Sequence, residues 1–269
     1  MRKEYSTKID RKYKKPVGES RVYNKKQESE PKTDIRLNRY ISNAGICSRR
    51  DADKLILSGD VTVNGKVVKE LGTQVSLKDI VKYKGKLLNP ERKVYVLLNK
   101  PKDTVTTSSD PQGRRTVIDL VQYACEERIY PVGRLDRQTT GVLLLTNDGD
   151  LSKKLTHPSS NTKKIYHVFA ERPVNQEHIK QIAKGVELED GLIKADEISY
   201  VDSDKRQVGI EIHSGKNHVV RRIFEHFGYT IEKLDRVYFA GLTKKKLPRG
   251  KWRFLTDQEI KFLKAGILG

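Results

Sequence analysis

Apolar residues first recur along this chain at helical spacing and then at strand spacing. The helical positions are Leu37, Tyr40, Ile41 and Ala44. Gly45 ends this first predicted helix, because glycine readily adopts the left-handed conformation found after a helix. Ser48 is placed to cap a second helix that stops at Gly59, and Asp51 stands three residues later, as in a capping box.

A β-hairpin is predicted directly after these helices. Val61–Val63 and residues 66–68 are rich in β-branched side chains and flank Asn64-Gly65, the dipeptide typical of a two-residue hairpin turn. Helices and hairpin together predict an α/β module of about fifty residues, near the lower limit for independent folding. We place it at residues 34–88, because Asn89-Pro90 is a turn signal that marks its end.

Strand and helix patterns are mixed from Val94 onward. Strands are predicted at 94–98, 142–145, 198–201 and 208–212, and around Val168. Helices are predicted at 118–123, 151–155, 176–184, 219–227 and 256–264, the last with Thr256 and Glu259 as a capping box. Residues 89–269 are therefore predicted to form a mostly antiparallel mixed sheet flanked by helices, which makes the fold class α+β.

Residues 1–33 differ in composition from the rest of the chain. They are rich in Lys, Arg, Glu, Ser and Pro and nearly free of aliphatic side chains. Such a segment buries too little apolar surface to offset the entropy of ordering, so we predict a disordered basic arm. Two interpretations of its role stay open, a solubilising leader and an arm that raises nonspecific affinity for RNA.

Basic residues outnumber acidic ones across the chain. There are 54 Lys and Arg against 35 Asp and Glu, which gives a net charge of +19 and a pI near 9.7. This surplus suits a protein that binds nucleic acid or an anionic membrane surface, or it serves solubility alone. No apolar stretch is long enough to cross a membrane, and the first residues lack the apolar core of a signal peptide. We therefore expect a cytoplasmic protein that binds a polyanion.

The cysteines and histidines give no sign of a metal site. Cys47 and Cys125 are the only cysteines, and they lack the spacing of a zinc motif. We expect reduced thiols and no bound metal. No repeated apolar face stands out, so a monomer is expected.

One short polar loop carries the clearest candidate for chemistry. Within residues 131–149 a single carboxylate, Asp136, precedes the apolar strand at 142–145. Arg134 and Arg137 flank it in sequence and are expected to favour its ionised form. An ionised aspartate on a loop fixed by a buried strand is a candidate catalytic group. The alternative is an ordinary turn former, which is what most aspartates between strands are.

Three segments together resemble the motifs of the RsuA-type pseudouridine synthases. The first joins Gly-Arg-Leu-Asp at 133–136 to Leu-Leu-Leu-Thr-Asn-Asp-Gly at 143–149. The second is Lys-Ile-Tyr-His-Val at 164–168, and the third is the turn and helix at 215–224. All three follow the family's order, and similar segments extend the resemblance over about residues 94–260. Two positions depart from the family pattern, Asp103 where glycine is frequent and Val219 where glutamine is common.

The resemblance implies an isomerase that needs no cofactor. Asp136 matches the family's essential aspartate, either as a nucleophile at ribose C1′ or as a base at C2′. Tyr166 matches the tyrosine that stacks on the detached base, although most strand aromatics of this kind are core residues. Arg221 matches the basic residue that pairs with the aspartate, the alternative being a phosphate contact.

Further residues are expected to contact RNA. By resemblance, Arg134 fills the gap left by a flipped uridine, while Lys164 and Arg222 contact the RNA near the site. The predicted module resembles the S4 RNA-binding domain. That resemblance implies RNA contacts for Arg36, Arg49, Arg50 and Asn64. A helix start ordinarily prefers acidic residues, so the paired arginines favour an RNA contact over a merely solvated face.

Several functions remain open at this stage. The favoured one is a pseudouridine synthase for ribosomal RNA or a pre-ribosomal particle, with 23S preferred over 16S rRNA. Residues 155–159 and 247–250 support 23S, because they look most like the large-subunit branch of the family. The alternative from another class is a noncatalytic S4-domain protein that binds rRNA or aids ribosome assembly. A tRNA-modifying relative is disfavoured by the S4-like module.

Overall fold

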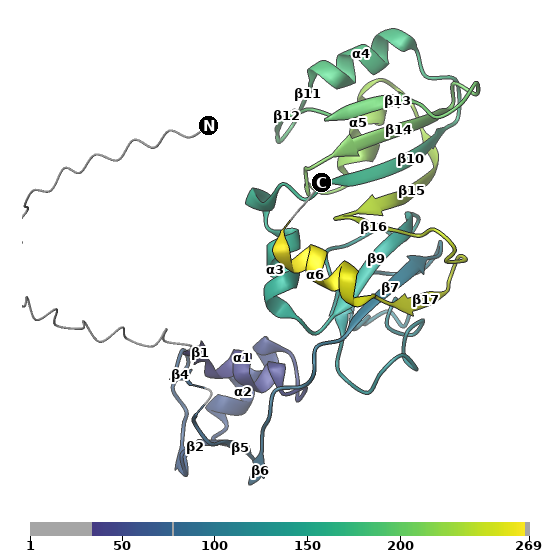
Figure 1. Ribbon diagram of the computed structural model, residues 1–269. Coiled ribbons are helices and arrows are strands. Elements are labelled where there is room, and N and C mark those ends of the chain that lie inside the picture. Colours follow the sequence, from purple (N-terminus) through teal and green to yellow (C-terminus); the bar gives the residue numbers. More distant parts are fainter. Residues whose placement is uncertain (1–33, 77, 267–269) are drawn as a thin grey trace, which may run out of the picture.

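The computed structural model describes residues 34–76 and 78–266, which form a small N-terminal module and a larger C-terminal domain (Figure 1). The predicted arm at residues 1–33 lies outside the described residues. The module is built from α1 (Leu37–Asn43), α2 (Arg49–Leu57) and a sheet in the order β3-β2-β5-β6. Its strands are β1 (Ile35–Arg36), β2 (Val61–Val63), β3 (Lys66–Val67), β4 (Gln74–Val75), β5 (Val81–Tyr83) and β6 (Lys86–Leu87).

The module follows its local sequence signals closely. Both helices and the hairpin lie where they were predicted. The Ser48 hydroxyl accepts a hydrogen bond from the Asp51 backbone N–H at 3.2 Å, which caps α2. Asn64 and Gly65 have φ values of +50° and +82°, as the predicted two-residue turn requires. Leu88 still packs in the core of the module, together with residues of both helices.

The C-terminal domain is organised around one nine-stranded sheet. Its main order is β13-β14-β10-β15-β9-β7-β17, with β8 beside β9 and β16 beside β15. The strands are β7 (Tyr95–Lys100), β8 (Tyr130–Pro131), β9 (Thr140–Thr146), β10 (Lys164–Ala170), β13 (Glu197–Tyr200), β14 (Gln207–Ile212), β15 (Ile231–Phe239), β16 (Leu242–Thr243) and β17 (Trp252–Phe254). The β9–β15 pair is parallel and the other strand pairs in this sheet are antiparallel, which confirms the predicted mostly antiparallel mixed sheet. A separate hairpin joins β11 (Val186–Leu188) to β12 (Gly191–Ile193).

Helices cover both faces of this sheet. They are α3 (Gly149–Thr156), α4 (Gln176–Lys184), α5 (Val219–His226) and α6 (Asp257–Ala265), with a short 3₁₀ turn at Pro158–Ser160. Along β7 the side chains alternate: Val96 and Leu98 join the core that contains α4 and α5, and Leu97 joins the core that contains α3 and α6. Figure 1 shows α3 and α6 together beside β7 and β9, with α5 behind the strands at the other end. Both faces are therefore buried, and this fixes the strand ends that carry the site.

The helix predicted at 118–123 is wrong, because this segment forms consecutive turns. Val121 and Ala124 each donate a backbone hydrogen bond to the carbonyl three residues earlier, at 3.0 and 2.8 Å. Val117 and Val121 are nevertheless buried in the main core. Turns can bury apolar side chains three or four positions apart just as a helix does, so the spacing alone misled the prediction.

The module and the C-terminal domain are in contact through α1 and the first residues after the module. The Glu91 backbone N–H donates to the carbonyl of Asn43 at 2.9 Å, and Arg39 of α1 forms an ion pair with Asp150 of α3. Asn147 donates to the carbonyl of Arg92 at 2.8 Å, which ties the connection to the end of β9. The residues that connect the module to the C-terminal domain thus lie along that domain.

Candidate active site

A buried lysine supports the loop that carries Asp136. Lys100 ends β7 and is fully buried, with 0% of its surface exposed. Its ammonium donates hydrogen bonds to the carbonyls of Pro101, Asp136, Arg137 and Thr139, at 3.1, 3.0, 3.2 and 2.8 Å. Burial lowers the pKa of Lys100 to about 8, and the nearby carboxylate of Asp136 opposes that shift. The loop is thereby wrapped around one cation at the end of a rigid strand.

Two further contacts hold the ends of this loop. The Thr106 hydroxyl donates to the carbonyl of Leu135 at 2.6 Å, just before Asp136. After the loop, Gly141 has a φ of +111°, and a Cβ there would lie 2.1 Å from the carbonyl oxygen of Arg236. Only glycine permits so close an approach of β9 to β15, so Gly141 sets where the loop enters the sheet.

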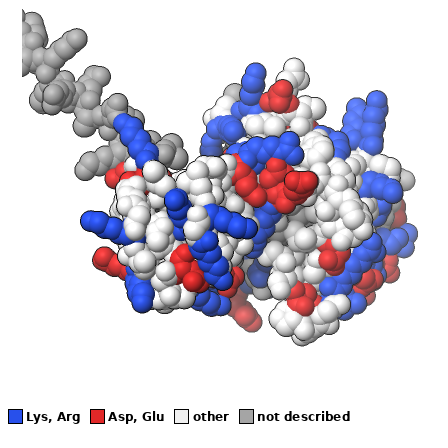
Figure 2. Space-filling model, turned by 90° about the horizontal axis from the view of Figure 1, so that it is seen from below, with Lys and Arg blue, Asp and Glu red and all other residues white. Residues whose placement is uncertain are grey.

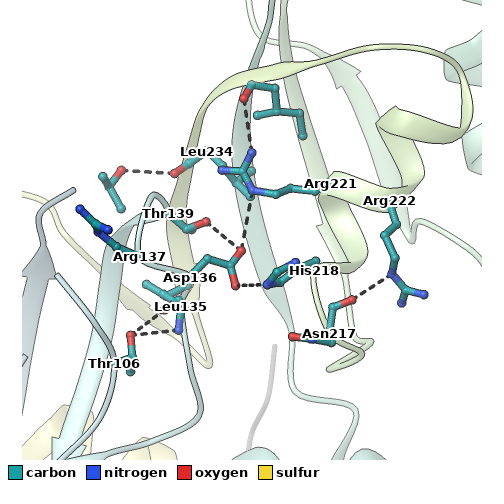
Figure 3. Close-up of polar contacts among 12 residues, drawn as sticks. Thr106, Leu135, Asp136, Arg137, Thr139, Asn217, His218, Arg221, Arg222 and Leu234 are labelled. Carbon is teal, nitrogen blue, oxygen red and sulfur yellow. Dashed lines mark hydrogen bonds and ion pairs between the residues drawn. The ribbon is translucent and has the colours of Figure 1, made fainter. Parts of the chain in front are cut away.

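The Asp136 carboxylate is held by groups from α5 and from its own loop (Figure 3). His218 Nε2 lies 3.1 Å from one carboxylate oxygen, and Arg221 Nε lies 3.8 Å from the other. The Thr139 hydroxyl donates to that second oxygen at 3.2 Å. Arg221 also donates to the carbonyl of Ile231 at 3.3 Å, which fixes the guanidinium between β15 and Asp136. The structure thus brings together Asp136 and Arg221, which lie far apart in sequence.

The two arginines that flank Asp136 in sequence do not form its ion pairs. Arg137 instead pairs with Asp103 at 3.3 Å, and Figure 3 shows its side chain pointing away from Asp136. Arg134 is exposed and lines the cavity at the site. The expectation that these neighbours hold the carboxylate charge is therefore corrected: the ion pairs of Asp136 are with α5 residues. Asp103 itself has a φ of +60°, which explains why glycine suits this position in the family.

His218 is the site residue that the sequence reasoning missed. It immediately precedes α5 with a φ of +47°, and its half-exposed ring faces Asp136. The available signal was its place in the turn at 215–224, between Asn217 and the helix. A charged or hydrogen-bonding imidazole here orients the carboxylate from the side opposite Thr139.

Tyr166 and Asp136 line the same cavity, whose volume is about 840 Å³. Tyr166 lies on β10 with 9% of its surface exposed, and Leu234 and Phe239 of β15 add apolar walls. The phenol is therefore a core residue on one side and a cavity wall on the other. A cavity with apolar walls and one carboxylate suits a flat ligand with a polar edge.

Lys164 also lines this cavity and is largely buried. Its ammonium donates to the carbonyls of Thr162 and His213 at 2.9 and 2.8 Å. Burial and, secondly, the nearby charge of Arg236 lower the pKa of Lys164 to about 8. Arg222 lies elsewhere: its guanidinium binds both carboxylate oxygens of Asp190 at 2.9 Å, and Figure 3 shows it directed away from Asp136.

The residues predicted for RNA contact in the module lie apart from the cavity. Arg36, Arg49 and Arg50 are exposed, and Figure 2 shows Lys and Arg side chains spread over the module and the adjoining C-terminal domain. Asn64 uses its amide inside the module, because it donates to Asp79 at 2.8 Å and accepts from the Ile80 backbone at 2.9 Å. Its RNA contact, like those of the arginines, stays a prediction.

The described residues contain neither a cluster of metal ligands nor a helix that could span a membrane. No group of three or more metal-ligating side chains occurs within residues 34–76 and 78–266. In the same part of the chain, no helix is long and apolar enough to span a membrane.

Comparisons with known proteins match both halves of the chain. Residues 94–226 match the RNA pseudouridylate synthase family, and residues 35–81 match the S4 domain family. An uncharacterized RNA pseudouridine synthase of Aquifex aeolicus is 42% identical over 84% of this chain and 92% of its own length. Ribosomal large subunit pseudouridine synthase B of Bacillus subtilis is 39% identical, covering 86% of this chain and 96% of the relative.

A solved structure agrees with these relatives. The crystal structure of a pseudouridylate synthase superposes with a TM-score of 0.61 and 30% sequence identity, over 85% of this chain and 99% of that one. The resemblance found in the motifs is thereby confirmed, as are the fold class and the enzymatic nature of the protein. This chain belongs to the family of RNA pseudouridine synthases, with an S4 domain ahead of the catalytic domain.

Proposed function

We propose that this enzyme isomerises a specific uridine of large-subunit (23S) ribosomal RNA in the cytoplasm, free or within a pre-ribosomal particle. The observation that carries the proposal is the Asp136 carboxylate, held by His218 and Arg221 in a cavity that Tyr166 also lines. The choice of RNA is supported by the large-subunit activity named for the Bacillus relative and by the large-subunit character of residues 155–159 and 247–250.

The isomerisation of uridine to pseudouridine requires little more than one correctly positioned carboxylate. The N1–C1′ bond of the uridine breaks, the uracil turns, C5 joins C1′, and a proton leaves C5 while N1 takes one up. Product and substrate have the same composition, so no redox cofactor or activated donor is consumed. Asp136 acts at the ribose, as a nucleophile at C1′ or as a base at C2′, and both roles need its ionised form. Arg221 and His218 fix the direction of the carboxylate.

The remaining cavity residues position the nucleotide. The target uridine must leave the RNA stack to reach Asp136, at a cost of a few kcal/mol. Arg134, exposed at the cavity, takes the place of the flipped base in the RNA. Tyr166 presents its ring to the detached uracil and holds it while it turns. Lys164 adds a cation to the cavity wall that draws the polyanion inward.

A direct test offers both ribosomal RNAs to the full chain. Unmodified 23S and 16S transcripts are incubated with the enzyme, without cofactors, and pseudouridines are mapped at nucleotide resolution. We expect a single new pseudouridine, in 23S rRNA. A pseudouridine formed in 16S rRNA alone contradicts the proposed substrate while leaving the reaction intact, and the absence of product in both contradicts the proposed function.

The S4 module is expected to supply sequence-independent affinity through its paired arginines. The double variant Arg49→Gln/Arg50→Gln should bind 23S rRNA about tenfold more weakly at physiological salt. Without these two phosphate contacts, binding releases fewer counterions than it does for the wild type. The slope of log affinity against log salt should fall by about 1–2. Arg206→Gln is the control, since that exposed arginine already pairs with Asp204 at 3.0 Å. Equal salt slopes for the wild type and the double variant would contradict the assignment.

A further inference from the structure

Arg236 is a buried cation whose hydrogen bonds are incomplete. It lies on β15 with 2% of its surface exposed. Its Nε donates to the carbonyl of Val142 at 2.9 Å, and the ring of Phe239 lies 4.5 Å from the guanidinium carbon. The buried Nη2, however, has no hydrogen-bond partner among the described residues. A buried polar group left unpaired is costly, so this atom needs an explanation.

The surroundings of Arg236 make its charge more costly still. Burial lowers the pKa of Arg236, and the charge of Tyr166 and a side-chain hydrogen bond with Tyr166 only partly oppose this. The charge of Lys164, on the neighbouring strand β10, acts against it as well. No acidic side chain within the described parts of the chain forms an ion pair with Arg236, so the cation lacks the anion that buried arginines ordinarily have.

A purely structural role explains only some of the contacts that this guanidinium can make. The contact with Val142 satisfies a carbonyl of β9, and Phe239 covers one face. Neither contact uses Nη2. Because Arg236 lines the same cavity as Asp136 and Tyr166, this free N–H belongs to the site where the substrate base must lie.

The position of Arg236 deep in the cavity determines which part of the RNA it can contact. Exposed side chains at the cavity, among them His157 and Asn217, are placed for the sugar-phosphate backbone. Arg236 lies on the strand beside Tyr166, paired in register with it, and is closed off from solvent. A bulky phosphodiester stays near the mouth, whereas a flat base extruded toward Tyr166 reaches this depth.

We propose that Arg236 donates a hydrogen bond through Nη2 to a carbonyl oxygen of the target uracil and stabilises the negative charge that the base acquires during the reaction. This rests on the proposed function. When the N1–C1′ bond breaks, its electron pair stays on the base, and the charge is shared by N1, O2 and O4. C5 of this anion then supplies the electron pair of the new bond to C1′, and a proton leaves C5 while N1 takes one up, which gives the neutral product. A fixed donor aimed at developing charge is worth about 10²–10³ in rate.

The test combines changes on both sides of the contact. The target uridine, mapped as above, is placed in an rRNA fragment as uridine, 2-thiouridine or 4-thiouridine. Single-turnover rates are measured for the wild type, Arg236→Gln and Arg236→Lys. Arg253→Gln is the control, because this arginine pairs with Glu259 at 2.7 Å outside the cavity. Thermal unfolding and RNA affinity are measured for every variant, and Arg236→Lys carries the test if Arg236→Gln does not fold.

We expect Arg236→Gln to slow conversion of the normal uridine about 10²–10³-fold with RNA affinity unchanged. One of the two thio substitutions should slow the wild type and Arg253→Gln but leave the Arg236 variants nearly unaffected, because the contact is already lost. That position identifies O2 or O4 as the acceptor. If both thio substitutions slow the Arg236 variants by the same factors as the wild type, the proposal is overturned. A failure of the proposed function looks different, since the wild type then makes no product from the unsubstituted RNA.

Discussion

Replacing Asp136 by asparagine should abolish pseudouridine formation while leaving the fold in place. The amide is isosteric and keeps a hydrogen bond with the Thr139 hydroxyl, yet it serves neither as a nucleophile nor as a base. We expect a loss of more than about 10⁴-fold in the single-turnover rate. The measurement is nucleoside analysis of 23S rRNA after reaction with excess enzyme.

A matched control separates chemistry from charge. Asp103→Asn removes a neighbouring carboxylate that pairs with Arg137, and its rate should stay within a few-fold of the wild type. RNA affinity should be nearly equal for the wild type and both variants. A rate for Asp136→Asn within tenfold of the wild type would show that this carboxylate is not the reacting group.

Lys100→Met should also lower activity, by a smaller factor and by a different route. The methionine fills the space but leaves the carbonyls of Asp136, Arg137 and Thr139 without the ammonium that now binds them. We expect the loop to shift and the rate to fall about 10²-fold, because such small misplacements of a reacting group are that costly. The free energy of unfolding of Lys100→Met should be lower than that of the wild type by about 1–3 kcal/mol at neutral pH. Thr107→Val, a change at an exposed turn hydroxyl that bonds Ser109, is the control.

The pH dependence of stability gives this variant a second readout. Folding lowers the pKa of Lys100 to about 8, while the unfolded chain keeps its proton up to the ordinary lysine value of 10.5. Between those values the unfolded state binds more protons, so this lysine makes the wild type more stable as pH rises. Lys100→Met lacks that gain, and its stability deficit should widen from pH 8 to 10 in denaturant titrations. A deficit that stays constant over this range would contradict the buried-ammonium account.

Local sequence signals were sufficient for the N-terminal module. Ser48 capping α2 and the Asn64-Gly65 turn each act within four residues, so neighbours alone decide the conformation. The same holds for α6, where Thr256 and Glu259 form the predicted capping box. The helix prediction at 118–123 was wrong, because the apolar spacing of this segment fits both a helix and a set of turns.

The site was only partly predictable, since it is assembled from distant segments. Order and identity of the motifs indicated Asp136, Tyr166 and Arg221, and the fold places all three at one cavity or beside it. Burial of a side chain depends on how the whole sheet is assembled. The residues next to Lys100 and Arg236 in sequence therefore did not indicate that both side chains are buried. The two arginines that flank Asp136 in sequence suggested the wrong ion-pair partners. Side chains of sequence neighbours in a turning loop point in different directions, and the ion-pair partners of Asp136 come from α5 and the residue just before it.

The most direct measurement follows the hydrogen at C5 of the target uridine. 23S rRNA carrying tritium at C5 of its uridines is mixed with excess enzyme, and tritium in water is counted beside the pseudouridine formed. The account predicts one tritium released for each pseudouridine with the wild type and none with Asp136→Asn. Equal release by both proteins, or pseudouridine formed by Asp136→Asn, would contradict the claim that this carboxylate drives the isomerisation.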